Sequence, residues 1–197
     1  MPTGTYFRLR EDKRRAIYRV LVDEFESHPL EEITIKRIVE RLHLPRGSFY
    51  QYFSSLNDCY FYVLDKELTE VHALFAALIK KKGGDLFAAL DAFGDAAADL
   101  LYDPKHYGLY RQRYLFMNAA LEREWHRYRE ESQDYTRDME PWVNPEKADF
   151  LGAVVHHLIR RLFAEEWSRK EFLSQYRCYL CWLKGGLKND VFDGTVL

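Results

Sequence analysis

Apolar residues recur along the chain with a helical period. Near the amino terminus, the spacing of Ile17, Val20, Leu21 and Phe25 predicts a helix that ends near His28–Pro29. The same spacing predicts further helices over residues 35–42, 45–53, 56–82, 85–102, 107–137, 146–168 and 171–187. Apolar and polar residues do not alternate anywhere for long enough to indicate a strand. The pattern therefore predicts an all-α protein.

Two of the predicted helices are short and adjacent. A helix of two turns over residues 35–42 is followed by a break at Leu42-His43-Leu44 and by a second short helix. Thr34 is a suitable N-cap for the first, and Pro45 suits the start of the second because its missing N–H is not needed there. This arrangement is typical of a helix-turn-helix, whose second helix can enter the major groove of DNA.

Charge is unevenly distributed around this unit. Residues 21–32 are acidic and separate two basic segments. The basic residues of these segments are Arg8, Arg10, Lys13, Arg14, Arg15, Arg19, Lys36, Arg37, Arg41 and Arg46. If the chain folds back, the two segments can form one basic face for a polyanion; the alternative is ordinary solvated helix surface.

Composition narrows the class of protein further. Hydrophobic residues make up 47% of the 197-residue chain and aromatic residues 16%, which is enough for a packed core. No apolar run approaches the roughly 18 residues that a membrane span requires. The 3 cysteines and the absence of an apolar leader favour a cytoplasmic protein. A net charge of −2 excludes binding of polyanions by the chain as a whole.

Residues 34–53 carry a closer likeness. They read TIKRIVERLHLPRGSFYQYF, with a Gly-Ser-Phe-Tyr-x-Tyr-Phe core at residues 47–53. This run closely resembles the DNA-binding domain of the TetR family of transcription regulators. The resemblance implies a helix-turn-helix domain over residues 1–55 and a larger helical domain for ligand binding and dimerisation over residues 56–197.

The chemistry of the motif fits contact with operator DNA. Gly47 allows the backbone to approach DNA closely, and the Ser48 hydroxyl can bind a phosphate. Gln51 points away from Phe49 and Phe53 and can read an adenine edge, whereas Arg46 suits guanine or phosphate. With the contacts that the resemblance implies, the expected DNA-binding residues are Thr34, Lys36, Arg37, Arg46, Gly47, Ser48, Tyr50, Gln51 and Tyr52.

The motif departs from the family pattern at two informative positions. His43 stands where the family usually has glycine, so its backbone must tolerate a left-handed or similar conformation. Leu56 stands where the family usually has a lysine that contacts phosphate. The loss of this charge predicts weaker DNA binding, which the basic residues near the amino terminus can offset electrostatically.

Two apolar sets beyond residue 56 suggest further binding surfaces. Apolar rows on the last two helices can form a symmetric four-helix dimer interface, or they can be buried within one chain. The residues expected at the interface are Val154, Val155, Leu158, Leu162, Tyr176 and Leu180. Aromatic residues between 85 and 137 can line a pocket for an apolar or aromatic ligand, or they can fill a solid core. The residues expected in the pocket are Phe93, Tyr110, Tyr114, Met117 and Trp125.

Catalytic and metal-binding signals are weak. The pair Cys178-x-x-Cys181 lacks a second pair of the same kind, which favours reduced structural thiols over a redox or zinc site. No nucleotide-binding, hydrolase or metalloprotease motif occurs. We therefore expect no metal, no cofactor and no enzymatic activity.

The resemblance implies a homodimeric repressor that binds double-stranded operator DNA and is released from it by a small molecule. Two alternatives remain open at the level of sequence. One is a helical small-molecule binding protein with weakened DNA binding, for which Leu56 is the argument. The other is a TetR-like activator.

Overall fold

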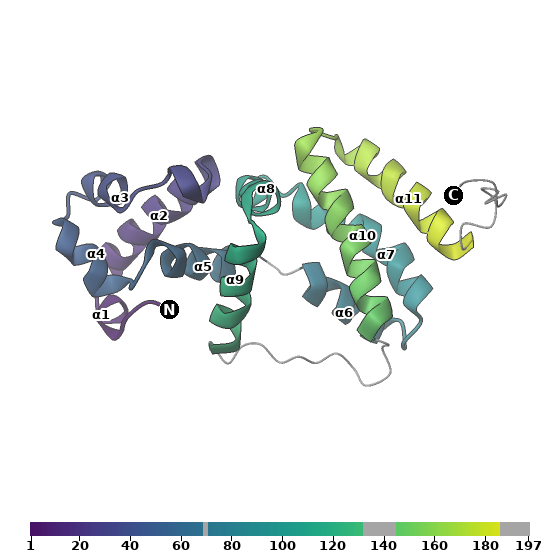
Figure 1. Cartoon of the computed structure of the whole chain (residues 1–197), viewed down its shortest axis with the longest axis horizontal. Coiled ribbons are helices and arrows are strands. Elements are labelled where there is room, and N and C mark those ends of the chain that lie inside the picture. The colour runs from purple at the N-terminus through teal and green to yellow at the C-terminus, as the bar shows by residue number, and fades with distance from the viewer. Residues whose placement is uncertain (69–70, 132–144, 186–197) are drawn as a thin grey trace, which may run out of the picture. The chain divides into compact units, whose positions relative to one another are not determined.

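The computed structural model describes residues 1–68, 71–131 and 145–185, and its regular elements are helices (Figure 1). These residues contain no strand, which confirms the all-α class. The chain forms two compact units, and the second contains α6 (Val71–Lys81), α7 (Leu86–Leu101), α10 (Pro145–Ala164) and α11 (Arg169–Gly185). The first contains α1 (Gly4–Phe7), α2 (Glu11–Ser27), the 3₁₀ helix η1 (Leu30–Glu32), α3 (Ile35–Arg41), α4 (Arg46–Tyr52), α5 (Leu56–Glu67), α8 (Tyr107–Phe116) and α9 (Ala119–Glu131).

Several helix ends lie where local sequence signals place them. The Thr34 hydroxyl accepts the Arg37 N–H at 3.2 Å and caps α3, and the Asp85 carboxylate caps α7. Gly83, with a φ of 63°, follows the end of α6, as its freedom to adopt left-handed backbone allows. His43 also has a positive φ of 52°, which confirms the left-handed turn expected between α3 and α4.

The prediction of a single helix over residues 56–82 is wrong. The structure has α5 and α6 instead, and the backbone of Leu68 is extended, with φ −102° and ψ 129°. The reason lies in α5, which buries six consecutive residues, Cys59 to Leu64, and so is surrounded by protein on every side. A helix that is buried on all sides has no single apolar face. The spacing of its apolar residues therefore does not show where α5 ends and α6 begins.

The single helix predicted over residues 107–137 is likewise divided, into α8 and α9. Asn118 accounts for the second start, because its side-chain oxygen accepts the N–H groups of Ala120 and Leu121, each at 3.0 Å. Residues 132–137 of that prediction, and 186–187 of the last one, lie outside the described residues. The short helix α1 was not predicted at all.

The core of the first unit is rich in aromatic side chains. Helix α2 packs against α3, α5 and α8, and it buries Ile17, Leu21 and Phe25 in these contacts. The fully buried ring of Tyr6 lies 5.0 Å from that of Phe53, centroid to centroid. The four-residue helix α1 is therefore anchored by its aromatic side chain and lies against α4.

A charged cluster joins the end of α5 to the start of α8 within the first unit. The Glu67 carboxylate lies 3.3 Å from both Lys105 Nζ and His106 Nε2, and it accepts a 2.7 Å hydrogen bond from the Tyr18 hydroxyl. His106 Nδ1 lies 3.1 Å from an oxygen of Asp103. Burial raises the pKa of Glu67, but hydrogen bonds from Tyr18, Lys105 and His106 outweigh it and lower that pKa overall. Glu67 is thus held as a carboxylate.

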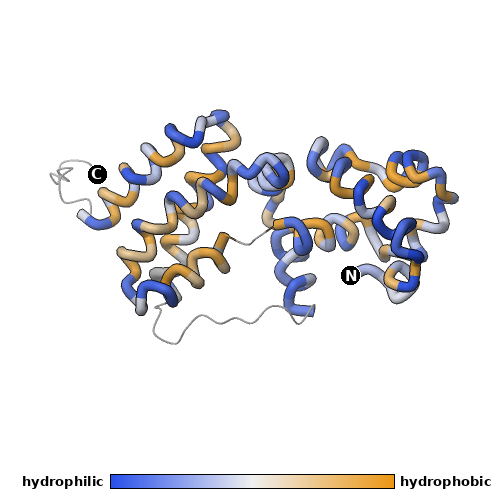
Figure 2. Tube along the Cα trace, turned by 180° about the vertical axis from the view of Figure 1, so that it is seen from behind, coloured by the Kyte–Doolittle hydropathy of each residue, from blue (hydrophilic) through white to orange (hydrophobic). Residues whose placement is uncertain are grey.

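The core of the second unit is centred on α7, which packs against α6 and α11. Along α11, hydrophobic and hydrophilic residues recur from turn to turn (Figure 2), as expected for a helix with one buried face. Gly94 allows close approach, because a Cβ there would lie 2.6 Å from the ring of Tyr176. The Tyr176 hydroxyl then donates to the carbonyl oxygen of Leu90 at 2.7 Å. None of the described helices is long and apolar enough to cross a lipid bilayer.

Candidate nucleic-acid interface

Helices α3 and α4 pack together as a helix-turn-helix within the first unit. Their inward side chains, Ile38, Val39, Phe49 and Phe53, are each at most 5% exposed, so the packed face of α4 is fixed. The opposite face is open to solvent and presents Arg46, Gly47, Tyr50 and Gln51. This is the outward orientation expected for Gln51 from its position relative to Phe49 and Phe53.

Gly47 occupies an open position on this outward face. No atom lies within 4 Å of where its Cβ would stand. Packing within the protein therefore does not require glycine here. A glycine in a helix costs roughly 1 kcal/mol relative to alanine, so its presence favours a role in contact with something outside the chain.

A buried acidic residue fixes the orientation of α3. Glu24 of α2 is fully buried, and its Oε1 accepts hydrogen bonds from Arg37 Nε at 3.1 Å and Arg41 Nη1 at 2.5 Å. Arg41 also reaches Asp23 at 2.6 Å. Hydrogen bonds from Arg41 to Glu24 and then Asp23 raise the pKa of Arg41, so it stays cationic. Two guanidinium groups thus compensate one buried charge.

This ion-pair cluster distinguishes the two basic residues expected to contact DNA from α3. The guanidinium group of Arg37 is committed to Glu24 and also lies 3.1 Å from His28 Nε2. The Lys36 side chain is 75% exposed, with its ammonium group 3.7 Å from a Glu40 oxygen. Lys36 is therefore the better placed of the two for a phosphate. No sequence pattern indicates the role of Glu24, which resembles any other acid in the segment 21–32.

The amino-terminal segment holds the far end of α4. The Thr3 N–H donates to the carbonyl oxygen of Tyr52 at 2.8 Å, and the Thr3 hydroxyl donates to that of Gln51. These carbonyl groups lack partners within α4 because they belong to its last turn. Residues 1–7 therefore fix the position of the helix that carries Tyr50 and Gln51, a role that no helical period could reveal in so short a segment.

The remaining predicted DNA contacts differ in accessibility. Thr34 is exposed, although its hydroxyl oxygen already caps α3, and Ser48 is half-buried. Tyr52 is only 5% exposed, and its ring lies 6.4 Å from that of Tyr6 with Lys13 Nζ 5.8 Å from its centroid. The ring of Tyr52 belongs to the core, so its contact with DNA stays a prediction for the hydroxyl group alone.

The residues predicted to line a ligand pocket are divided between the two units. Phe93 belongs to the second, where its ring lies 5.3 Å from that of Phe75. Tyr110, Tyr114, Met117 and Trp125 belong to the first. Tyr110 and Trp125 are buried, and Tyr114 and Met117 are half-buried. A pocket shared by all five stays a prediction.

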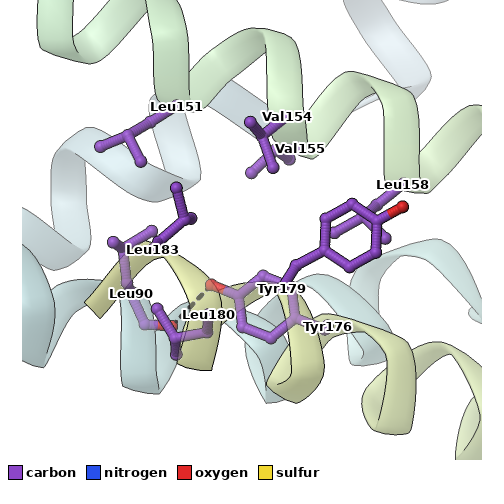
Figure 3. Close-up of a pocket in the computed structure, with 9 residues that line it drawn as sticks. All are labelled: Leu90, Leu151, Val154, Val155, Leu158, Tyr176, Tyr179, Leu180 and Leu183. Carbon is purple, nitrogen blue, oxygen red and sulfur yellow. Dashed lines mark hydrogen bonds between the residues drawn. The ribbon is translucent and has the colours of Figure 1, made fainter. Parts of the chain in front are cut away.

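The residues predicted at a dimer interface converge instead within the second unit. Leu158, Leu162, Tyr176 and Leu180 are each at most 7% exposed in the single chain. Leu158, Tyr176 and Leu180, with the half-buried Val154 and Val155, line a cavity of about 10 Å³ among α7, α10 and α11 (Figure 3). The four buried residues are thus core, and they do not offer exposed surface to a partner. The apolar rows correctly indicated that these side chains are buried. They did not indicate whether the same chain or a second copy buries them.

The chain is similar to known proteins in two comparisons. Residues 86–186 match the family described as "Tetracyclin repressor, C-terminal domain". Among solved structures, a TetR family transcriptional regulator from Chloroflexus aurantiacus J-10-FL is similar, with 24% sequence identity and a TM-score of 0.49. The alignment covers 93% of this chain and 91% of that one. No curated protein matches the chain.

Two separate parts of the chain thus lead to the same family. Residues 34–53 carry its helix-turn-helix motif, and the structure folds them as two short helices with an outward-facing second helix. The family match lies entirely outside that motif and spans more than half of the 197 residues. The chain belongs to the TetR family of transcription regulators.

Proposed function

We propose that the chain is a repressor that binds operator DNA as a homodimer through the outward face of α4. The observation that carries this proposal is the exposed set Arg46, Gly47, Tyr50 and Gln51, which packing within the protein leaves open. The two units group helices by packing, so the functional boundary after residue 55 is part of this proposal.

A genomic selection with the purified protein, followed by measurements of affinity against salt, tests the proposal. Lys36→Ala should lower the slope of log K against log salt by about 1, because one phosphate contact is lost. Lys170→Ala, which removes an exposed lysine from α11, should leave the slope unchanged. Weak binding to every genomic fragment would instead support the alternative of a small-molecule binding protein, for which Leu56 is the sequence argument.

Gly47→Ala should separate stability from DNA binding. The new methyl group meets no atom of the protein, so the free energy of unfolding should be unchanged or rise by up to about 1 kcal/mol. Operator affinity should fall at least about tenfold, because the methyl group obstructs the approach of the DNA backbone. Gly185→Ala is the control, since its Cβ also meets no atom within 4 Å. Unchanged operator affinity of Gly47→Ala would argue against a close DNA contact there.

Gln51→Ala should alter sequence preference. Loss of the amide should cost about 1–3 kcal/mol at the cognate operator and relax one base pair in each half-site. Tyr50→Phe removes only a hydroxyl, so it should weaken cognate and non-cognate DNA by similar factors. Binding-site selection with both variants measures the difference. A uniform loss of affinity for Gln51→Ala, with an unchanged preferred sequence, would show that this residue anchors the helix rather than reads a base.

The proposed dimer uses the outer side of α10 and α11. Its aromatic surface consists of Phe150, His157, Tyr179 and Trp182; Phe150 and Trp182 are 59% and 46% exposed, and Tyr179 is half-buried because it also lines the cavity among α7, α10 and α11. The rings of Tyr179 and Trp182 lie 5.3 Å apart, and His157 stacks on Tyr179. Exposed aromatic side chains favour a protein interface, and a second copy of the chain fits the symmetric arrangement of most oligomers.

Release by a small molecule is the part of the proposal that family membership alone supports. The cavity among α7, α10 and α11, at about 10 Å³, has room for a single water molecule at most. A ligand acting there would have to favour a more open conformation of the second unit. The effect of a ligand on operator affinity, and the direction of regulation in a reporter assay, would distinguish a repressor from an activator.

A further inference from the structure

Two cysteine side chains on α11 are open to solvent. The sequence favoured structural thiols for Cys178 and Cys181, but both are exposed and neither fills space in the core. Cys59 contrasts with them, because it is fully buried in α5 and burial raises its pKa well above the ordinary value. The accessible thiols of the described chain are therefore Cys178 and Cys181, and packing does not account for them.

The helix sets the separation of these two thiols. Residues three apart lie on the same side of a helix, with Cβ atoms about 5–6 Å apart. An unstrained disulfide needs about 3.5–4.5 Å between Cβ atoms, so the spacing disfavours a direct S–S bond. A soft atom bonded to both sulfurs holds them farther apart than the roughly 2.0 Å of an S–S bond, so a bridged pair tolerates a wider Cβ spacing than a disulfide does. The geometry suits one soft atom held between two sulfurs.

The surroundings restrict the kind of acceptor. In the part of the chain that the structure describes, no group of three or more histidine, cysteine and acidic side chains could hold a metal ion. A structural zinc site needs four protein ligands, so two thiolates suit softer acceptors that are satisfied by a sulfur pair. At 3.6 residues per turn, Cys181 lies about 160° around α11 from Tyr179, whereas Cys178 lies about 40° from Trp182 and so borders the aromatic surface.

We propose that Cys178 and Cys181 together bind one thiophilic acceptor, of which a trivalent arsenical is the representative. In the reaction with phenylarsine oxide, two S–H bonds break and two As–S bonds form. The two protons leave with the oxide oxygen as water, and arsenic stays trivalent, so neither an oxidant nor a reductant is needed. This site goes beyond the proposed function and its test does not involve DNA.

The test is a titration of the reduced full-length protein with phenylarsine oxide, read by native mass spectrometry. The expected result is one arsenical per chain that resists an excess of a monothiol and is released by a dithiol. Cys178→Ser and Cys181→Ser should each weaken retention at least about tenfold, because the second As–S bond forms within one molecule. Both residues are exposed, so the serine variants should keep the circular dichroism spectrum of the wild type.

Ser174→Ala is the matched control. It alters an exposed residue one turn before Cys178 and leaves both thiols in place, so it should bind the arsenical as the wild type does. Cys59 is present in every variant, which keeps any contribution from it constant. Failure of the wild type to retain an arsenical would overturn the proposal. Equal retention by either serine variant would overturn it too, because the two thiols would then not act as a pair.

Discussion

Replacement of Arg37 and Arg41 together by methionine is expected to lower the free energy of unfolding by about 3–5 kcal/mol. Both arginines compensate the carboxylate of Glu24, which has no exposed surface. Methionine keeps the aliphatic bulk of each side chain but removes the charge, so the double variant leaves a buried carboxylate without a cation. Chemical denaturation followed by circular dichroism measures the loss.

A third substitution tests the cause. Glu24→Leu added to the double variant should restore much of the stability, because a buried ionic cluster can often be replaced by apolar groups of similar volume. Arg15→Met is the control: this exposed arginine pairs with Glu11 on the surface of α2, and its loss should cost less than about 1 kcal/mol. A double variant as stable as the Arg15→Met control would show that the cluster contributes little to the fold.

Trp182→Glu is expected to convert the proposed dimer to monomers at micromolar concentration. A buried tryptophan at an interface often contributes 2 kcal/mol or more, and a two-fold axis places the substitution in the interface twice, so a loss of about 4 kcal/mol is reasonable. Because Trp182 is 46% exposed in the single chain, the thermal unfolding of each monomer should change little. Light scattering measures the mass, and operator binding should fall with dimerisation.

Arg177→Glu introduces the same side chain at an exposed position of α11, about 140° around the helix from Trp182, and should leave the dimer intact. Leu158→Glu would be a poor test, since Leu158 is 1% exposed and its substitution should unfold the second unit. A Trp182→Glu variant that stays dimeric would move the interface away from the aromatic surface.

The helix-turn-helix could be predicted from sequence because its signals are local. Thr34 was expected to cap α3 and does so, and the position of His43 required the left-handed backbone that it adopts. The open face of α4 followed from the positions of Phe49 and Phe53, one turn apart. Each of these inferences depends on a few neighbouring residues, and helical geometry relates them directly.

The parts that sequence missed depend on contacts between distant residues. The role of Glu24 is set by arginines on another helix, and the hydrogen bonds from Thr3 reach a helix nearly fifty residues away. Leu158 and Leu162 showed that one side of α10 is buried, but an apolar row does not reveal whether its cover comes from the same chain. Only the folded structure supplies the partner in such cases.

The cluster around Glu67 has a mechanical consequence. The chain passes from the first unit to the second shortly after Glu67 and returns to the first at Asp103. The two ring nitrogens of His106 link these points, because one lies near Glu67 and the other near Asp103. A force that pulls on the chain at one of these two points is therefore also felt at the other, because His106 links them. The Tyr18 hydroxyl donates to the same carboxylate and so links this tie to α2. Helix α2 also carries Glu24, so the Glu67 cluster and the ion pairs that orient α3 are anchored on the same helix.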